Sequence, residues 1–292
     1  MSIRSIARRV VALAFLAALA APFAEGASAE TTLERIKKQG YVRMGFANET
    51  PFSFATPEGT LAGIDVEIIT HVVNKMGVKE IDGGLTTFGG LIPGLAAKRF
   101  DIVSSAIYIK PDRCKQVAFA EPLYILGDAI IVTKGNPKKL HSYADVAKNS
   151  ALKIGYPTGG TGVSDNAKAM GVKDDQLIGF PDGPSGFAAV KAGRIDGYAT
   201  TAMVGETQLR ELKDPSVERA DPFEQPMADG KIRYGIASFA VRLEDKDLLD
   251  EMNKHLKALM GTPEYLAILS KHGMTQADLP PKGKTTADAC KG

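Results

Sequence analysis

The sequence predicts an α/β fold made of two similar halves, each with a mostly parallel sheet. Between residues 41 and 105, strand and helix patterns alternate in a β–α–β–α–β order, which is typical of parallel strands covered by helices. The alternation restarts after the turn at residues 134–137. A short echo links the halves, because Gly94–Val103 and Gly186–Tyr198 both read as a small-residue helix, then Arg, an apolar residue, Asp and a strand. Two α/β lobes are therefore expected.

Hydrophobic periodicity places the elements of the first half. Val42, Met44 and Phe46 alternate with other residues, as in a strand with one buried face. Apolar residues then recur at helical spacing, and Gly77 supplies a helix stop. The predicted elements are a helix over 32–38, a strand over 41–47, helices over 64–76 and 91–97, and a buried strand over 101–105.

The second half and the C-terminal segment follow the same rules. Gly159–Gly162 predicts a loop between a strand and a helix that Gly171 ends. Thr262 and Pro263 predict a helix start with a cap and a first-turn proline, and Gly273 ends that helix. The predicted elements are strands over 153–156 and 236–241, helices over 163–170 and 248–259, a helix from 263, and a polar tail over 282–292.

Residues 1–29 read as a secretory signal peptide. Arg4, Arg8 and Arg9 precede an apolar run over 10–21, and Ala27-Ser28-Ala29 has the small-x-small pattern of a cleavage site. A membrane anchor is the alternative, but about 12 apolar residues are too few for a bilayer that needs about 20. The sequence therefore predicts export to the periplasm.

Charge argues against nucleic acid as a partner. The leader holds three of the 36 basic and one of the 34 acidic residues, which leaves 33 of each in the remaining chain. A chain with no net charge has no basic field to attract phosphates or a membrane surface. We expect a soluble monomer.

Cys114 and Cys290 are the two cysteines. An even count in an exported chain predicts one disulfide between them, and the alternative is two free thiols. No CxxC or Cys–His spacing is present, so neither a metal site nor a redox role is predicted.

Motifs for cofactors and catalysis are missing from the sequence. Residues 159–162 do not extend to a GxGxxG fingerprint, and neither a P-loop nor a GxSxG elbow occurs. The four histidines lie in helix or loop patterns near Lys or Asn, where surface positions are expected. The sequence thus predicts no cofactor and no enzyme activity.

Polar and aromatic residues instead follow the predicted strands, where an open α/β sheet forms its ligand crevice. A guanidinium is suited to a carboxylate, a carboxylate to a cation, and aromatic rings to a flat or cationic body. Each residue also has a structural interpretation, as a core aromatic, a surface ion pair or a solvated turn. The residues concerned are Glu49, Phe52, Phe88, Tyr108 and Arg113, with Thr161 at a helix start in the second half.

The chain after the leader resembles the polar amino-acid-binding family of ABC-importer periplasmic proteins. The resemblance is carried by Gly40–Glu49, Gly63–Glu67, Leu91–Leu95, the Pro-Asp-Arg block at 111–113 before Phe119-Ala-Glu-Pro122, and Gly193–Asp196. It implies the type II periplasmic-binding fold, with two α/β lobes joined by a two-strand hinge. In the family the arginine at Arg113 binds the ligand carboxylate, and the residue at Thr161 adds its backbone.

Within the family the chain is most similar to the branch that binds ectoine and hydroxyectoine. This rests on Gly45–Phe52, the Phe88-Gly block, Tyr108–Cys114 and the block over 181–186 that contains Asp182. The branch implies that Glu49 meets the cationic ring and that Phe52, Phe88 and Tyr108 enclose it. Where relatives hold an α-amino group with Asp, this chain has Thr201, which favours a cyclic zwitterion over an ordinary amino acid.

The resemblance also implies the domain boundaries and the partner. Lobe 1 is expected over 30–133 and 237–292 and lobe 2 over 134–236, with crossings at Ala129–Lys134 and Arg233–Ser238. The expected partner is the permease of an ABC importer in the inner membrane. Alternatives are a polar amino acid as ligand, a dehydratase-like enzyme on the same fold, or a receptor that feeds a sensor.

Overall fold

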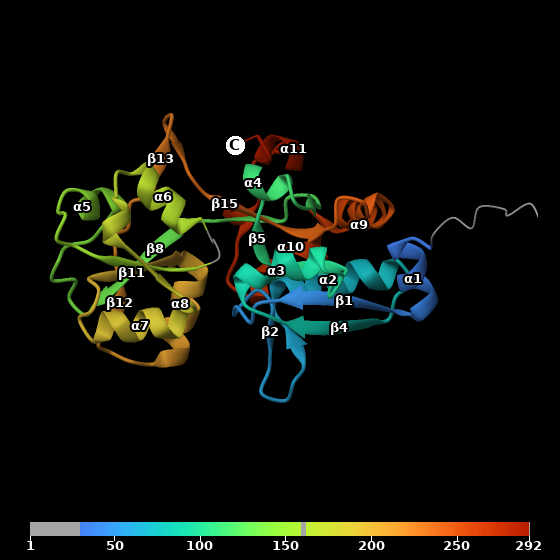
Figure 1. The fold of residues 1–292 in the computed structure, drawn as a ribbon, viewed down its shortest axis with the longest axis horizontal. Coiled ribbons are helices and arrows are strands. Elements are labelled where there is room, and N and C mark those ends of the chain that lie inside the picture. Colours follow the sequence, from blue (N-terminus) through green and yellow to red (C-terminus); the bar gives the residue numbers. More distant parts are fainter. Residues whose placement is uncertain (1–29, 159–161, 292) are drawn as a thin grey trace, which may run out of the picture. The chain divides into compact units, whose positions relative to one another are not determined.

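The structure, a computed structural model, describes residues 30–158 and 162–291. From Thr32 onward the chain forms one compact unit that contains two large sheets (Figure 1). The predicted leader at residues 1–29 lies outside the described residues. Within the part of the chain that the structure describes, no helix is both long and apolar enough to cross a membrane.

The first sheet has six strands and defines lobe 1. Its order is β4-β1-β5-β15-β6, and β7 also pairs with β15. β1 runs parallel to β4 and β5, whereas β15 runs antiparallel to β5. The strands are β1 (Tyr41–Phe46), β4 (Glu80–Leu85), β5 (Ile102–Tyr108), β6 (Ala118–Phe119), β7 (Tyr124–Leu126) and β15 (Gly235–Val241).

Helices bury the central strands of this sheet. Every residue of β5 and β15 is buried, as expected for strands covered on both faces. α2 packs against β5, α9 and α10, while α3 packs against β1 and β5. The helices are α1 (Thr32–Gln39), α2 (Ile64–Lys75), η1 (Phe88–Gly90), α3 (Leu91–Ala96), α4 (Pro111–Cys114), α9 (Lys246–Leu259), α10 (Pro263–Lys271), η3 (Gln276–Asp278) and α11 (Thr286–Ala289), and a hairpin joins β2 (Phe54–Ala55) to β3 (Leu61–Ala62).

The second sheet has five strands and defines lobe 2. Its order is β10-β9-β11-β8-β12, with β8 antiparallel to both neighbours. α7 and α8 pack against β8 and β11. The strands are β8 (Asp128–Thr133), β9 (Ile154–Pro157), β10 (Leu177–Phe180), β11 (Gly197–Thr201) and β12 (Val217–Arg219), the helices are α5 (Tyr143–Ala147), α6 (Val163–Ala169), η2 (Asp174–Gln176), α7 (Gly183–Lys191) and α8 (Ala202–Leu212), and a small hairpin joins β13 (Met227–Ala228) to β14 (Lys231–Ile232).

The first crossing between the sheets lies earlier than the sequence predicts. We expected residues 129–134 to form the crossing, but residues 128–133 are β8, which pairs with β11 and β12 inside the second sheet. The chain therefore leaves the first sheet after Leu126. Gly127 and Asp128 are all that separates the apolar residues of β7 from those of β8, and apolarity alone does not say which sheet a buried strand joins.

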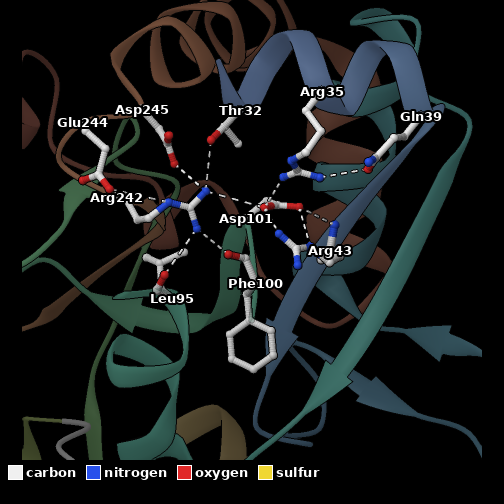
Figure 2. A network of polar contacts seen from close by, with 10 residues as sticks. All are labelled: Thr32, Arg35, Gln39, Arg43, Leu95, Phe100, Asp101, Arg242, Glu244 and Asp245. Atoms are coloured by element: carbon white, nitrogen blue, oxygen red, sulfur yellow. Dashed lines mark hydrogen bonds and ion pairs between the residues drawn. The ribbon is translucent and has the colours of Figure 1, made fainter. Parts of the chain in front are cut away.

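A buried ion-pair network ties three distant segments of lobe 1 together (Figure 2). The Asp101 side chain is fully buried and accepts bonds from Arg35 of α1 at 2.5 Å and from Arg43 of β1 at 2.8 Å. Arg242, directly after β15, lies 3.5 Å from Asp101 and 2.7 Å from Asp245. Because the carboxylate has several charged partners, its burial is compensated.

The predicted disulfide between Cys114 and Cys290 is confirmed. It joins the end of α4 to the residue after α11, with the two Cα atoms 5.8 Å apart. The predicted polar tail thus contains a short helix that is held to lobe 1 covalently.

Candidate functional site

A cavity of about 360 Å³ lies between the two lobes, at the carboxyl ends of their parallel strands. Lobe 1 contributes residues that follow β1 and β4, and lobe 2 contributes residues that follow β9 and β10 together with β11 and α8. Open α/β sheets bind ligands at this edge. The lining residues are Ala47, Asn48, Glu49, Leu85, Thr86, Thr87 and Phe88 from lobe 1, and Pro157, Thr158, Pro181, Asp182, Gly183, Pro184, Tyr198, Thr200, Val204 and Gln208 from lobe 2.

Glu49 is the ionisable residue among the described lobe 1 residues that line the cavity. It begins a tight turn after β1, in which the Glu49 amide donates to the Ser53 carbonyl at 3.0 Å and the Phe52 amide donates to the Glu49 carbonyl at 2.8 Å. Burial, assisted by the nearby Asp65 carboxylate, raises the pKa of Glu49 to about 8 against the opposing charge of Arg113. Glu49 is therefore a carboxyl group whose ionised form lacks enough compensating positive charge.

Arg113 lies next to this wall and is buried. Its Nη1 donates to the Tyr108 carbonyl at 3.1 Å, and its Cζ lies 5.5 Å from the centre of the Phe88 ring. This is cation–π geometry. Burial lowers the pKa of Arg113, but an arginine stays charged at neutral pH. The structure thus brings Glu49, Phe88 and Arg113 together, as the sequence predicts.

Tyr108 lies at the junction of the lobes. Its side chain is buried and lines a neighbouring cavity of about 480 Å³, together with Lys110 and Arg233. Burial raises the pKa of Tyr108 well above its ordinary value, and the charges of Asp128 and Glu49 raise it further. Tyr108 is therefore within electrostatic reach of Glu49, although it does not line the 360 Å³ cavity.

Lys110 forms a direct link between the lobes. Its Nζ donates to Oδ2 of Asp165 at 2.5 Å. Lys110 is the N-cap residue of α4 in lobe 1, and Asp165 lies in the first turn of α6 in lobe 2. The sequence alone did not predict this link, because the approach of α6 to α4 depends on tertiary structure.

Phe52 lies outside the described lining of both cavities, so the role predicted for it in enclosing the ligand stays a prediction. It is 1% exposed and its ring stacks on Tyr124, with ring centres 5.7 Å apart. The turn after β1 directs Glu49 to the cavity and Phe52 into the core of lobe 1. An aromatic after a strand fits either environment, so the sequence alone did not separate the two.

In lobe 2 the predicted site residues have three different outcomes. Asp182 lines the cavity and also caps α7, because its Oδ1 accepts the Ser185 amide at 2.8 Å. Thr201 is 3% exposed and caps α8, while its neighbour Thr200 lines the cavity, so the assignment of Thr201 to the ammonium position stays a prediction. Thr161 lies outside the described residues.

Sequence reasoning missed Tyr198, Thr200 and Gln208, which all line the cavity. The first two alternate along β11, and period-two spacing from Tyr198 would have selected Thr200 rather than Thr201. Gln208 lies on α8, two helical turns beyond the end of β11, and no local pattern marks it. Across the described ranges, no cluster of His, Cys, Asp or Glu has the arrangement of a metal site.

Comparisons with known proteins agree on the family. Residues 42–275 match the model for bacterial extracellular solute-binding proteins, family 3. A probable amino-acid ABC transporter periplasmic-binding protein, y4tE, from Sinorhizobium fredii is 35% identical over 262 residues, which are 89% of this chain and 86% of that protein. The cyclohexadienyl dehydratase of Pseudomonas aeruginosa is 28% identical over 71% of this chain and 75% of its own length.

The fold is also that of solved binding proteins. The structure of EhuB in complex with hydroxyectoine superimposes with a TM-score of 0.79 at 31% identity, covering 89% of this chain and 98% of that one. The predicted type II periplasmic-binding fold, with two α/β lobes, is therefore confirmed. The paired sheets, the cavity between them and the match over most of the sequence lead to one conclusion: this chain belongs to the bacterial extracellular solute-binding proteins of family 3.

Proposed function

We propose that this protein binds a compact zwitterion of the ectoine and hydroxyectoine type in the periplasm and delivers it to the permease of an ABC importer. The observation that carries the proposal is the grouping of Glu49, Phe88 and Arg113 beside one cavity between the lobes. A guanidinium, an aromatic ring and a carboxyl group suit a small guest with a carboxylate and a delocalised cation. The similarity to EhuB, solved with hydroxyectoine, supports the same ligand class.

Binding would act through lobe closure. In the proposal, the ligand first contacts Glu49 and Phe88 of lobe 1 and then Asp182 and Thr200 of lobe 2. Only contacts that differ between the open and closed states can shift that equilibrium. The closed form would be the one that the permease recognises. We propose that no cofactor takes part and that the protein acts as a monomer.

A polar amino acid is the second candidate ligand. Asp182 brings a second carboxylate to the cavity, on the lobe 2 side, and a carboxylate there suits an α-ammonium group. Calorimetry against ectoine, hydroxyectoine and the twenty amino acids separates the two candidates. Tight binding of an amino acid with no heat from either ectoine would contradict the first proposal. A product assay with prephenate would detect an activity of the dehydratase type.

Replacing Arg113 tests the proposed carboxylate partner. Arg113→Ala is expected to weaken ectoine binding by at least about 30-fold, because truncating one member of a buried charge pair usually costs about 2–5 kcal/mol. Arg113→Lys keeps the charge but loses the fork and should fall between the wild type and Arg113→Ala. Arg194→Ala, which removes an exposed arginine outside the cavity, is the matched control. An unchanged Kd for a folded Arg113→Ala protein would place the carboxylate elsewhere.

A further inference from the structure

The described lining of the 360 Å³ cavity is acidic. Its two charged residues are Glu49 on the lobe 1 side and Asp182 on the lobe 2 side, and none of the described lining residues is Lys, Arg or His. Tyr198 lines the same cavity: its pKa is raised by burial, and the charges of Glu49 and Asp182 both add to that rise. Both carboxylates therefore act on the same small space.

A third carboxylate, Asp65, is close enough for its charge to act on Glu49. Asp65 of α2 is completely buried and accepts bonds from the Ala106 amide at 2.7 Å and from the Tyr124 hydroxyl. These two donors hold Asp65 in place but add no positive charge. Its negative charge is among the causes that raise the pKa of Glu49. Two carboxyl groups that share a poorly solvated region cannot both ionise without cost.

Among the described residues, the positive charge that acts on Glu49 comes from Arg113. Arg113 of α4 opposes the effect of the carboxylates on Glu49, but its guanidinium also lies against Phe88 and the Tyr108 carbonyl. The remaining ionisable neighbours are the hydroxyls of Tyr108 and Tyr198, both of which feel the charge of Glu49. The site therefore has more acidic than basic groups before any ligand arrives.

We infer that the cavity takes the cationic end of its ligand between Glu49 and Asp182, and that Glu49 releases a proton to solvent when that cation arrives. The step is a simple exchange: the O–H bond of the neutral Glu49 carboxyl breaks, its proton goes to the buffer, and the resulting carboxylate pairs with the ligand cation. The ligand class is a zwitterion or cation whose positive charge is carried on N–H groups. The inference rests on the proposed function only for the presence of such a ligand.

The sign of the expected pH dependence follows from this exchange. Glu49, with its pKa near 8, is mainly neutral at pH 7 in the free protein, and the bound cation lowers that pKa. At a pH between the pKa of Glu49 in the bound protein and its pKa in the free protein, binding releases up to one proton. Affinity should therefore rise by up to about tenfold per pH unit in that range. The dependence should level off above about pH 8, where Glu49 is already ionised in the free protein.

Calorimetry in buffers of different ionisation enthalpy tests the exchange. Ectoine and L-arginine are titrated separately into the protein at pH 7 in phosphate and in Tris. For a probe that binds, the observed binding enthalpy should depend on the ionisation enthalpy of the buffer. The size of this dependence should correspond to the release of close to one proton. Glu49→Gln should remove this dependence, whereas Glu80→Gln, on an exposed edge strand, should preserve it. Asp182→Asn should weaken binding at least about fivefold while proton release persists.

The outcomes separate this inference from the proposed ligand. Ectoine binding without proton release would overturn the inference and leave the proposed function intact. Proton release with arginine, but no heat from ectoine, would support the inference and contradict the proposed ligand. If neither probe binds, carbon-13 NMR of the glutamate carboxyl groups, assigned with Glu49→Gln, still decides. Titration of Glu49 well above pH 6 supports the inference, and titration below pH 5 overturns it.

Discussion

The two lobes share the same local hydrogen-bond arrangement at the start of a central strand. Asp101, directly before β5, and the Arg43 backbone of β1 exchange bonds: the Asp101 amide donates to the Arg43 carbonyl at 2.8 Å, and the Arg43 amide donates to Asp101 Oδ2 at 3.1 Å. Asp196, directly before β11, does the same with Lys153, at 2.8 Å for both bonds. The sequence echo thus corresponds to one structural feature, an aspartate that fixes where two parallel strands begin.

The surroundings of the two aspartates differ. Asp101 is fully buried and has Arg35, Arg43 and Arg242 within 3.5 Å (Figure 2). The side chain of Asp196 is 23% exposed, and its ion pair is with Lys138 at 3.9 Å. The segments that meet at Asp101 come from α1, β1 and the residue after β15.

Chain connectivity explains the difference. Lobe 1 is assembled from two stretches far apart in the sequence, whereas the second sheet comes from one continuous stretch between Asp128 and Arg219. Joining distant segments costs more loop-closure entropy. Among the links that join the two stretches of lobe 1 are the Asp101 network and the disulfide. We infer that the lobe built from separate segments depends on these links for its stability.

Removing the disulfide should have the largest effect. Cys114→Ser with Cys290→Ser is expected to lower the free energy of unfolding by up to about 5 kcal/mol, because the bridge spans 176 residues and restricts the unfolded chain. Urea unfolding measures the loss, and reduced wild-type protein is the control. Amide exchange should increase in β15 and hardly change in β9. Equal increases in both strands would contradict the proposed difference between the lobes.

Asp101→Asn should have the second largest effect on stability. The substitution removes the buried negative charge that pairs with three arginines. We expect the free energy of unfolding to fall by about 3 kcal/mol at pH 7. Burial opposes ionisation, but the bonds from Arg43 and the charge of Arg35 hold the pKa of Asp101 below its ordinary value. The stabilisation is therefore present above about pH 4 and is lost as the pH falls further. Urea unfolding of wild type and variant between pH 3 and 7 should show the two curves converging in acid.

Asp196→Asn should have the smallest effect of the three. The amide side chain can still accept the Lys153 amide proton, and little charge pairing is lost at a distance of 3.9 Å. A loss of about 1 kcal/mol is expected, as for one ordinary hydrogen bond. Thermal unfolding measured beside Asp101→Asn provides the comparison. If Asp196→Asn were as costly as Asp101→Asn, burial and arginine pairing would not be what distinguishes the lobes.

Regular elements were predictable because their signals are local. The helix expected over 64–76 is α2 (Ile64–Lys75), and the helix start at Thr262 is confirmed, since its hydroxyl accepts the Tyr265 amide at 3.2 Å. The predicted end of an element was wrong where pairing with a neighbouring strand decides it. The strand expected over 101–105 continues to Tyr108, because β15 pairs with its final residues.

The site was less predictable than the fold. Glu49, Phe88 and Asp182 line the cavity because they follow strands at one edge of each sheet, and strand ends can be read from the sequence. Phe52 and Thr201 also follow strands, yet one packs in the core and the other caps a helix. The orientation of a side chain after a strand depends on the turn and on what packs against it.

By itself the sequence determined the alternation of strands and helices, the paired halves, the strand-end residues and the even pair of cysteines, since each is set by spacing along the chain. Tertiary structure alone decided that β8 joins the second sheet, that Phe52 faces Tyr124, and that Glu49 and Asp182 meet across one cavity. Such choices depend on contacts between segments distant in sequence, which compete for the same buried surface and the same hydrogen-bond partners.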